Sequence, residues 1–320
     1  MASIQEIKRR IKSVTSTRQI TKAMELVSAT KMRKSQEVAL LSRPYAIEAL
    51  RILGELTLRT QYLPQIMQAR EIKKTAVVLA ASDRGLAGSF NANVIRAFEK
   101  WHEKEAPMPQ DRGPDQRVGR TYVYIAVGKK AEEAFARKGI KPVASFKRFG
   151  DYIKQEEVKP LTKFLVEGYL KTNWDRVVMI ATHFRSTLRQ EVLVREMLPI
   201  SAKEVRRAVK EIVPEYGRFA GIKHGDASVT ETAADFEYLV EPEAQQVLDM
   251  LAPKLVEIAL YDIILEANAS EHSARMVAMK NASENAEELK DDLTILYNKS
   301  RQGNITREIS EIVSGAEALT

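Results

Sequence analysis

The sequence has 320 residues, of which 44% are hydrophobic and 29% charged, so it is long and apolar enough to bury a sizeable core. No run approaches the roughly 20 apolar residues that a membrane-spanning helix needs, and the first residues lack the apolar centre of a secretory signal. Cysteine is absent, which excludes a disulfide framework, a thiolate nucleophile and a cysteine metal site.

The formal net charge of +7 is concentrated near the start of the chain. Residues 1–34 contain nine of the 50 Lys and Arg residues but only two of the 43 acidic residues, so the rest of the chain is neutral overall. Such asymmetry favours an acidic partner: nucleic acid, anionic lipid or acidic protein loops. A helix face exposed to water is the simpler interpretation, and the charge alone leaves both open.

Residues 4 to about 58 have the pattern of a long helix. Their apolar residues recur at spacings of three and four, with a change of phase after the first four: Ile4, Ile7, Ile11, Val14, Ile20, Met24, Val27, Val38, Leu41 and Tyr45. Pro44 is the only strong breaker, and it predicts a kink or a local break.

The middle of the chain, residues 59–241, alternates strand and helix signals. Short apolar runs rich in β-branched residues predict buried strands at KKTAVVLAASD, TYVYIAVG and DRVVMIATHF. Helical stretches separate them: NANVIRAFEKWHEK, KKAEEAFARKG and KQEEVKPLTKFLVEGYLKT. This order predicts an α/β domain with a mostly parallel, doubly wound, Rossmann-like sheet. RQEVLVREMLPI is a candidate edge strand, and two polar inserts interrupt the plan near 107–120 and 201–235, the second with a short helix around 205–212.

A second long helical pattern covers residues 242–320. Its apolar positions include Val247, Leu251, Leu255, Ile258, Leu289, Leu293 and Leu296, and its end carries a seam of Ile305, Ile309, Ile312, Ala316 and Leu319. About 75 helical residues would extend on the order of 110 Å, more than the width of a domain of this size. Two such helices at opposite chain ends most simply pair as an antiparallel coiled coil. A compact bundle of kinked helices is the alternative.

The stretch SDRGLAGSFNANV is the strongest candidate for a chemical motif. A glycine-rich turn between a strand and a helix can hold a phosphate, but this one lacks both the GK[ST] ending and the GxGxxG spacing. A tight turn with Asn91 or Asn93 capping the helix is the favoured interpretation. The four histidines have no metal-ligand spacing, there is no GxSxG elbow, and we expect no catalytic residue, metal or cofactor.

Several long segments, taken in order, carry a resemblance to a known family. They are IKRRIKSVTSTRQITKAMELVSATKM, RPYA, SDRGLAGSFNANV, EYLVEP, SEHSARMVAMKNASENAEEL and LYNKSRQGNITREISEIVSGA. The chain closely resembles the γ subunits of rotary ATP synthases, and the match covers both termini and the middle. The two polar inserts are departures from the family pattern.

The resemblance implies a non-catalytic rotor subunit in the central stalk of an ATP synthase. Such a subunit couples ion flow through the membrane c-ring to ATP synthesis from ADP, or to ATP hydrolysis, in the ring of α and β subunits. Its implied partners are the α, β and ε subunits and the c-ring, without nucleic acid. Its implied place is peripheral, on the cytoplasmic face of a bacterial-type membrane.

The resemblance also implies contact residues. Contacts with β subunits fall on Lys8, Arg9, Lys22, Lys31, Arg33, Arg301, Gln302, Thr306 and Glu308. The apolar seam Ile305, Ile309, Ile312, Ala316 and Leu319 becomes the tip that turns in an apolar sleeve at the top of the ring. Tyr238 and Glu241 match positions that meet the c-ring.

Two functions of other classes were weighed against this one. A nucleotide-binding α/β enzyme with helical arms predicts a phosphate-binding glycine loop, which the sequence lacks. A basic coiled-coil module for nucleic acid or lipid would use the N-terminal charge, with an affinity that falls steeply with salt, but it leaves the C-terminal motif unexplained.

Overall fold

The computed structural model describes residues 4–105, 121–150, 152–200 and 240–317. These residues belong to two compact units. Unit 1 combines Met1–Ala29 with Arg275–Thr320, and unit 2 comprises Thr30–Ala274. The polar inserts expected near 107–120 and 201–235, with the short helix around 205–212, lie outside the described residues. The division at residues 58 and 241 stays a prediction.

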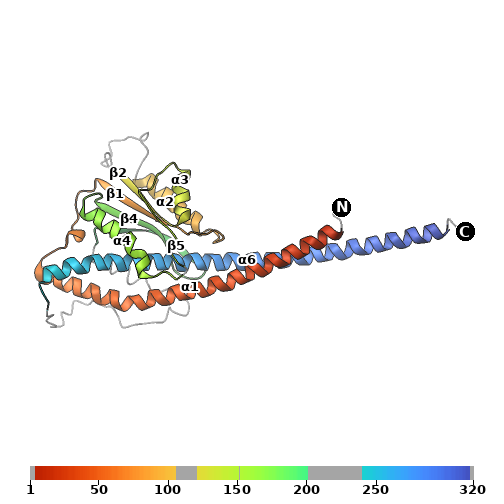
Figure 1. Ribbon diagram of the computed structural model, residues 1–320, viewed down its shortest axis with the longest axis horizontal. Coiled ribbons are helices and arrows are strands. Elements are labelled where there is room, and N and C mark those ends of the chain that lie inside the picture. Colours follow the sequence, from red (N-terminus) through yellow and green to blue (C-terminus); the bar gives the residue numbers. More distant parts are fainter. Residues whose placement is uncertain (1–3, 106–120, 151, 201–239, 318–320) are drawn as a thin grey trace. The chain divides into compact units, whose positions relative to one another are not determined.

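Two long helices begin and end the described chain, as predicted (Figure 1). Helix α1 spans Ile4–Thr60 and helix α6 spans Ala244–Glu317. Of the kink or local break expected at Pro44, the break is wrong, because α1 continues through this residue, and the kink stays a prediction. Pro44 is exposed, so water can bind the backbone carbonyl that loses its helical partner there.

The sheet of unit 2 has five strands in the order β3-β2-β1-β4-β5. The strands are β1 (Lys74–Ala80), β2 (Thr121–Val127), β3 (Ala144–Phe146), β4 (Arg176–Phe184) and β5 (Gln190–Leu198). The first four are parallel, and β5 is an antiparallel edge strand, which confirms the predicted architecture. The short β3 was not predicted.

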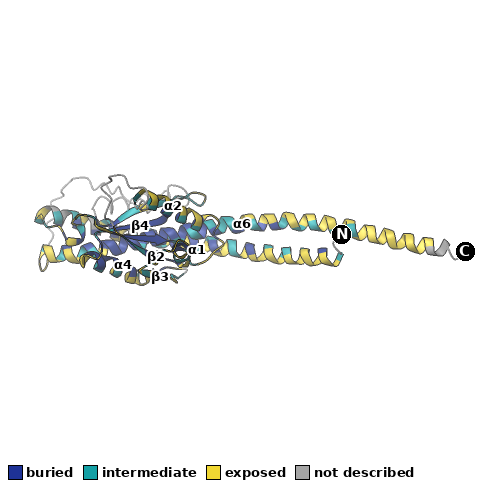
Figure 2. Cartoon of the chain, turned by 90° about the horizontal axis from the view of Figure 1, so that it is seen from above, coloured by how far each residue is buried: buried dark blue, intermediate teal, exposed yellow. Residues whose placement is uncertain are grey.

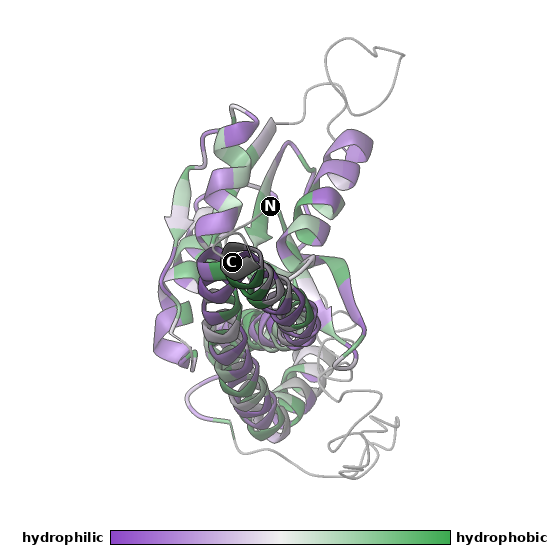
Figure 3. Cartoon of the chain, turned by 90° about the vertical axis from the view of Figure 1, so that its right-hand side faces the viewer, coloured by the Kyte–Doolittle hydropathy of each residue, from purple (hydrophilic) through white to green (hydrophobic). Residues whose placement is uncertain are grey.

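Helices cover both faces of this sheet, as a doubly wound fold requires. On one face, α2 (Phe90–Glu105) and α3 (Lys129–Arg137) pack on strand residues such as Val77, Leu79 and Ile180. On the other face, α4 (Gln155–Leu170) and the unit 2 parts of α1 and α6 pack on Val78 and Met179. A short 3₁₀ turn, Gln65–Met67, follows α1. Figure 3 shows that the helices carry hydrophilic residues on much of their outer surface.

The unit 2 part of α6 is buried on nearly all sides, which is the pattern of a helix inside a core (Figure 2). Every residue from Leu255 to Leu260 is buried, including the acidic Glu257. The Glu257 carboxylate accepts hydrogen bonds from Gln155 Nε2 at 2.8 Å and Lys254 Nζ at 2.9 Å. These partners compensate for the loss of water around a buried charge.

The apolar seam predicted for α1 is only partly correct. Ile7 is buried as expected, but Ile20 and Val27 are 61% and 51% exposed, and Leu41 and Tyr45 are also exposed. The buried face instead follows small residues: Thr21, Ser28, Ser35 and Ala39. Small side chains let two helices approach more closely than leucine or isoleucine would. This explains why α1 buries the face with its small residues and leaves Ile20 and Val27 exposed.

Candidate interaction surfaces

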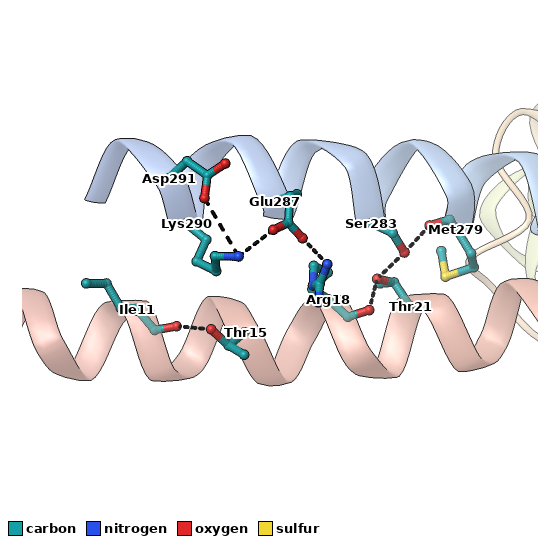
Figure 4. Close-up of polar contacts among 9 residues, drawn as sticks. All are labelled: Ile11, Thr15, Arg18, Thr21, Met279, Ser283, Glu287, Lys290 and Asp291. Atoms are coloured by element: carbon teal, nitrogen blue, oxygen red, sulfur yellow. Dashed lines mark hydrogen bonds and ion pairs between the residues drawn. The ribbon is translucent and has the colours of Figure 1, made fainter. Parts of the chain in front are cut away.

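A pair of hydroxyl groups joins the two helices of unit 1 (Figure 4). Thr21 Oγ1 of α1 lies 2.7 Å from Ser283 Oγ of α6, and both side chains are buried. Each hydroxyl also lies near a backbone carbonyl of its own helix, that of Arg18 or Met279. Because the pair must align to form its bond, it fixes one register between the helices.

An ion cluster lies on the same helix pair, next to the hydroxyl pair (Figure 4). The Arg18 guanidinium donates to the Glu287 carboxylate across the pair, and Lys290 of α6 donates to the same carboxylate. The hydrogen bond from Lys290 lowers the pKa of Glu287, and Arg18 adds to this effect. Residue numbers rise on α1 as they fall on α6 along these contacts, so the helices are antiparallel in unit 1.

An open groove lies beside these contacts, between the two helices of unit 1. Its volume is about 620 Å³, and its lining includes Arg18, Lys22, Leu26, Lys280 and Glu284. A lining of alternating charges with one exposed leucine suits contact with a polar protein surface better than enclosure of a small apolar ligand.

The basic residues expected to meet β subunits divide between the units. Lys8 and Arg9 are exposed in unit 1, while Lys22 pairs with Glu25 of its own helix at 2.9 Å. Arg33 is exposed in unit 2, and Lys31 is half-buried there. Lys22 is exposed despite this pairing, so four of the five side chains, all but Lys31, lie open to a partner.

The C-terminal part of α6 is a helix whose side chains are all exposed from Arg301 to Ser314 (Figure 2). Ile305, Ile309 and Ile312 are 47%, 56% and 72% exposed. Thr306 Oγ1 donates to the backbone oxygen of Gln302 at 3.0 Å, which leaves the Gln302 amide group available to a partner. A row of exposed isoleucines on one helix is the kind of surface that a partner covers.

The remaining predicted residues are only partly described. Arg301 and Glu308 lie on the exposed segment of α6, and Glu241 is exposed just before α6 begins. Ala316 lies in α6 without a description of its side chain, while Leu319 and Tyr238 lie outside the described residues.

The glycine turn after β1 is held by its own side chains. Asn91 Oδ1 accepts from the backbone N–H of Ser82 at 3.0 Å. The expectation that Asn91 or Asn93 caps α2 is wrong, because α2 begins at Phe90 and both residues lie inside it. The Asp83 carboxylate accepts from the backbone N–H groups of Lys129 and Arg148, both at 2.8 Å. These bonds join the segment after β1 to the first residue of α3 and to the segment after β3.

The residues that sequence reasoning missed are the polar contacts of the helix pair: Arg18, Thr21, Ser283 and Glu287. Serine and threonine are usually exposed, and a 269-residue separation hides the pairing of Arg18 with Glu287. Among the described residues, no cluster of His, Cys, Asp or Glu could hold a metal ion. In the same residues, no helix has the length and apolar character needed to cross a membrane.

Comparison with known proteins gives consistent matches over the full length of the chain. A family model described as ATP synthase matches residues 3–319. The ATP synthase gamma chain of Roseiflexus castenholzii is 39% identical over 322 residues, which cover 100% of this chain and 99% of the relative. That of Moorella thermoacetica is 38% identical over 320 residues, covering 100% of both.

Solved structures support the fold. A chain of the Euglena gracilis mitochondrial ATP synthase, in the OSCP/F1/c-ring structure of rotational state 3, has a TM-score of 0.61 at 18% identity and covers 99% of this chain and 94% of its own. A chain of the Tetrahymena thermophila central stalk/c-ring structure has a TM-score of 0.54 at 22% identity, with coverages of 82% and 99%.

Proposed function

The chain belongs to the ATP synthase gamma chain family, and we propose that it is the central-stalk rotor subunit of a rotary ATP synthase. The observation that carries this proposal is the full-length match at 39% identity to a named gamma chain. The long helix α6, with an exposed C-terminal segment, suits a shaft that other subunits surround.

The proposed mechanism transfers rotation to the catalytic sites by contact. An asymmetric shaft touches each β subunit of the surrounding ring differently, so each site is biased toward a different conformation. Turning the shaft then moves every site through binding, reaction and release. A helix pair with polar contacts at fixed positions, such as Thr21 with Ser283, resists sliding of one helix along the other while torque is applied.

We propose partners for three surfaces of the chain. The basic residues Lys8, Arg9, Lys22, Lys31 and Arg33, with the exposed Arg301, Gln302, Thr306 and Glu308, contact β subunits. The tip residues Ile305, Ile309, Ile312, Ala316 and Leu319 turn in an apolar sleeve formed by the top of the ring. Glu241 and Tyr238 meet the c-ring, and the ε subunit binds nearby, on the cytoplasmic face of the membrane.

The chain itself is proposed to be non-catalytic, and the isolated protein should not bind ATP tightly. The glycine turn after β1 lacks both the GK[ST] ending and the GxGxxG spacing of phosphate-binding loops, and Asp83 in this stretch adds a negative charge. Isothermal calorimetry should therefore give no saturable heat with micromolar ATP and magnesium. A one-to-one complex of micromolar affinity would contradict this prediction.

Reversing the charge at Lys8, Arg9 and Lys22 together should impair assembly or coupling while leaving unit 2 folded. All three lie on unit 1, where exposed charges contribute at most about 1 kcal/mol each to folding. The matched control reverses the exposed Lys100, Lys141 and Lys159 of unit 2, which changes the net charge equally. ATP-driven proton pumping is the readout. Equal pumping by both triple variants and the unchanged chain would contradict an acidic partner for the N-terminal face.

Purification of the complex from its native membrane tests the proposed function directly. The tagged chain should bring down nucleotide-binding α and β subunits in equal amounts, with several copies of each for one copy of this chain. Recovery of the chain alone, or with nucleic acid after a low-salt wash, would favour the basic coiled-coil module instead.

A further inference from the structure

Two acidic residues lie buried one turn apart on α6, inside unit 2. Asp262 is 4% exposed and Glu266 is 7% exposed, and a spacing of four places them on one face of the helix. Two carboxylates this close do not both ionise without partners, because burial and mutual repulsion penalise the charged form. Their surroundings therefore decide which one keeps a proton.

Glu266 has two cationic or donor partners from the sheet. Its Oε2 lies 2.6 Å from His183 Nδ1 of β4 and 3.7 Å from the Arg195 guanidinium of β5. Arg195 Nη2 also lies 3.3 Å from His183 Nδ1, so Glu266 belongs to a buried polar cluster with these two residues of the sheet.

Asp262 has a different partner, the hydroxyl of Ser42 on α1. Ser42 Oγ lies 2.7 Å from Asp262 Oδ1 and 2.8 Å from the backbone oxygen of Ala39. A serine hydroxyl has one hydrogen, so it cannot donate to two acceptors at full strength. A proton on Asp262 resolves this conflict, because Asp262 then donates to Ser42 and Ser42 donates to Ala39.

We propose that Asp262 and Ser42 form a proton-dependent lock between α1 and α6 in unit 2, closed when Asp262 is protonated and weakened when it ionises. Ionisation leaves a buried negative charge that competes with the Ala39 carbonyl for a single hydrogen. It also places this charge one turn from Glu266. The hydrogen bond from Ser42 to the charged carboxylate offsets part of this cost, and the remaining penalty of a buried charge beside Glu266 loosens the contact between the two helices.

The electrostatic surroundings of Asp262 agree with this lock. Burial raises the pKa of Asp262 to about 7, with the Glu266 charge adding to the rise while the Ser42 hydrogen bond and Arg195 oppose it. The pKa of about 7 places the loss of the Asp262 proton close to neutral pH. The polar and titratable groups of the cluster are Ser42 from α1, Glu266 and Tyr261 from α6, His183 from β4 and Arg195 from β5.

The direction of the pH effect follows from the raised pKa. Between pH 3.8 and about 7 the unfolded chain has lost this proton while the folded chain keeps it. Raising the pH through this window therefore favours opening, and the equilibrium constant for opening rises by up to about tenfold per pH unit. This rise ends above the pKa that Asp262 has in the folded chain.

Hydrogen exchange on the full-length chain tests the lock. Protection factors for backbone amides of residues 39–46 should fall with pH between pH 5 and 7, relative to the same amides in Asp262→Asn. Asparagine is neutral and can donate to Ser42, so it mimics the closed state at every pH. Glu48→Gln, which removes an exposed acid of α1, is the matched control and should follow the unchanged chain.

A second measurement keeps the test decisive if Asp262→Asn does not fold. Infrared spectra of the unchanged chain labelled with ¹³C-aspartate should contain a protonated carboxyl band at pH 6 that disappears with a midpoint near pH 7. Parallel pH profiles for the unchanged chain and a folded Asp262→Asn, or the absence of a protonated aspartate band at pH 6, would overturn the proposal.

Discussion

Alanine at position 128 is expected to destabilise unit 2 by roughly 3–5 kcal/mol, a large part of a typical folding free energy. Gly128 follows β2 with φ of +88°, a conformation that L side chains rarely adopt. A Cβ atom there would lie 2.0 Å from the backbone oxygen of Ala81, at the end of the neighbouring strand β1. The strands must move apart to admit it, because backbone atoms cannot turn aside as a flexible side chain can. Urea denaturation followed by circular dichroism measures the loss.

Gly139 is the matched control for this substitution. It also has a positive φ, +68°, but a Cβ atom there would meet nothing within 4 Å. Gly139→Ala should therefore cost only the backbone strain, about 1–2 kcal/mol. Equal losses for the two variants would show that backbone conformation alone, and not the approach to Ala81, explains the effect.

Truncation after Ser310 is expected to weaken assembly with the α and β subunits by roughly a hundredfold. It removes Ile312 and Val313, which are 72% and 53% exposed in the free chain. Burial of each side chain in an apolar sleeve would contribute about 1.5 kcal/mol or more to the free energy of assembly. The two together contribute about 3 kcal/mol, which corresponds to roughly a hundredfold in affinity. The helix before the cut should stay folded, because its contacts with α1 in unit 1, Arg18 with Glu287 and Thr21 with Ser283, lie well before the cut. Complex yield at limiting subunit concentration measures the loss.

The double substitution Gln302→Ala and Thr306→Ala should have the opposite effect, with near-normal assembly and reduced coupling. The only described hydrogen bond between these residues runs from the Thr306 hydroxyl to a backbone oxygen, and alanine favours the helix, so the shaft should keep its stability. Complexes that assemble poorly with the double variant but normally with the truncation would reverse this assignment of roles.

Most of the fold was predictable because its elements are long or strongly apolar. The strand KKTAVVLAASD and the long helices at each end have signals that local sequence carries, and the antiparallel pairing follows from their length. The strand Ala144–Phe146 was missed because three residues are too few to show a period. The buried face of α1 was misplaced because periodicity followed Ile20 and Val27, while close packing selected Thr21 and Ser28.

The contact residues of the candidate surfaces stay predictions. Arg301 and Ile305 are exposed, but their roles come from family resemblance, since an exposed charge or isoleucine has no specific partner by itself. The polar contacts Arg18 to Glu287 and Ser42 to Asp262 depend on which helix faces align, and no local pattern contains that information.

Rotation of this chain inside a ring of α and β subunits is the central claim, and single-particle rotation measures it most directly. The ring is immobilised on glass, and a bead is attached to an exposed position of unit 2, such as Lys141 replaced by cysteine in a chain that has no other cysteine. With ATP and magnesium, the bead should turn continuously in one direction. A bead that shows only Brownian motion while the ring hydrolyses ATP would contradict the account.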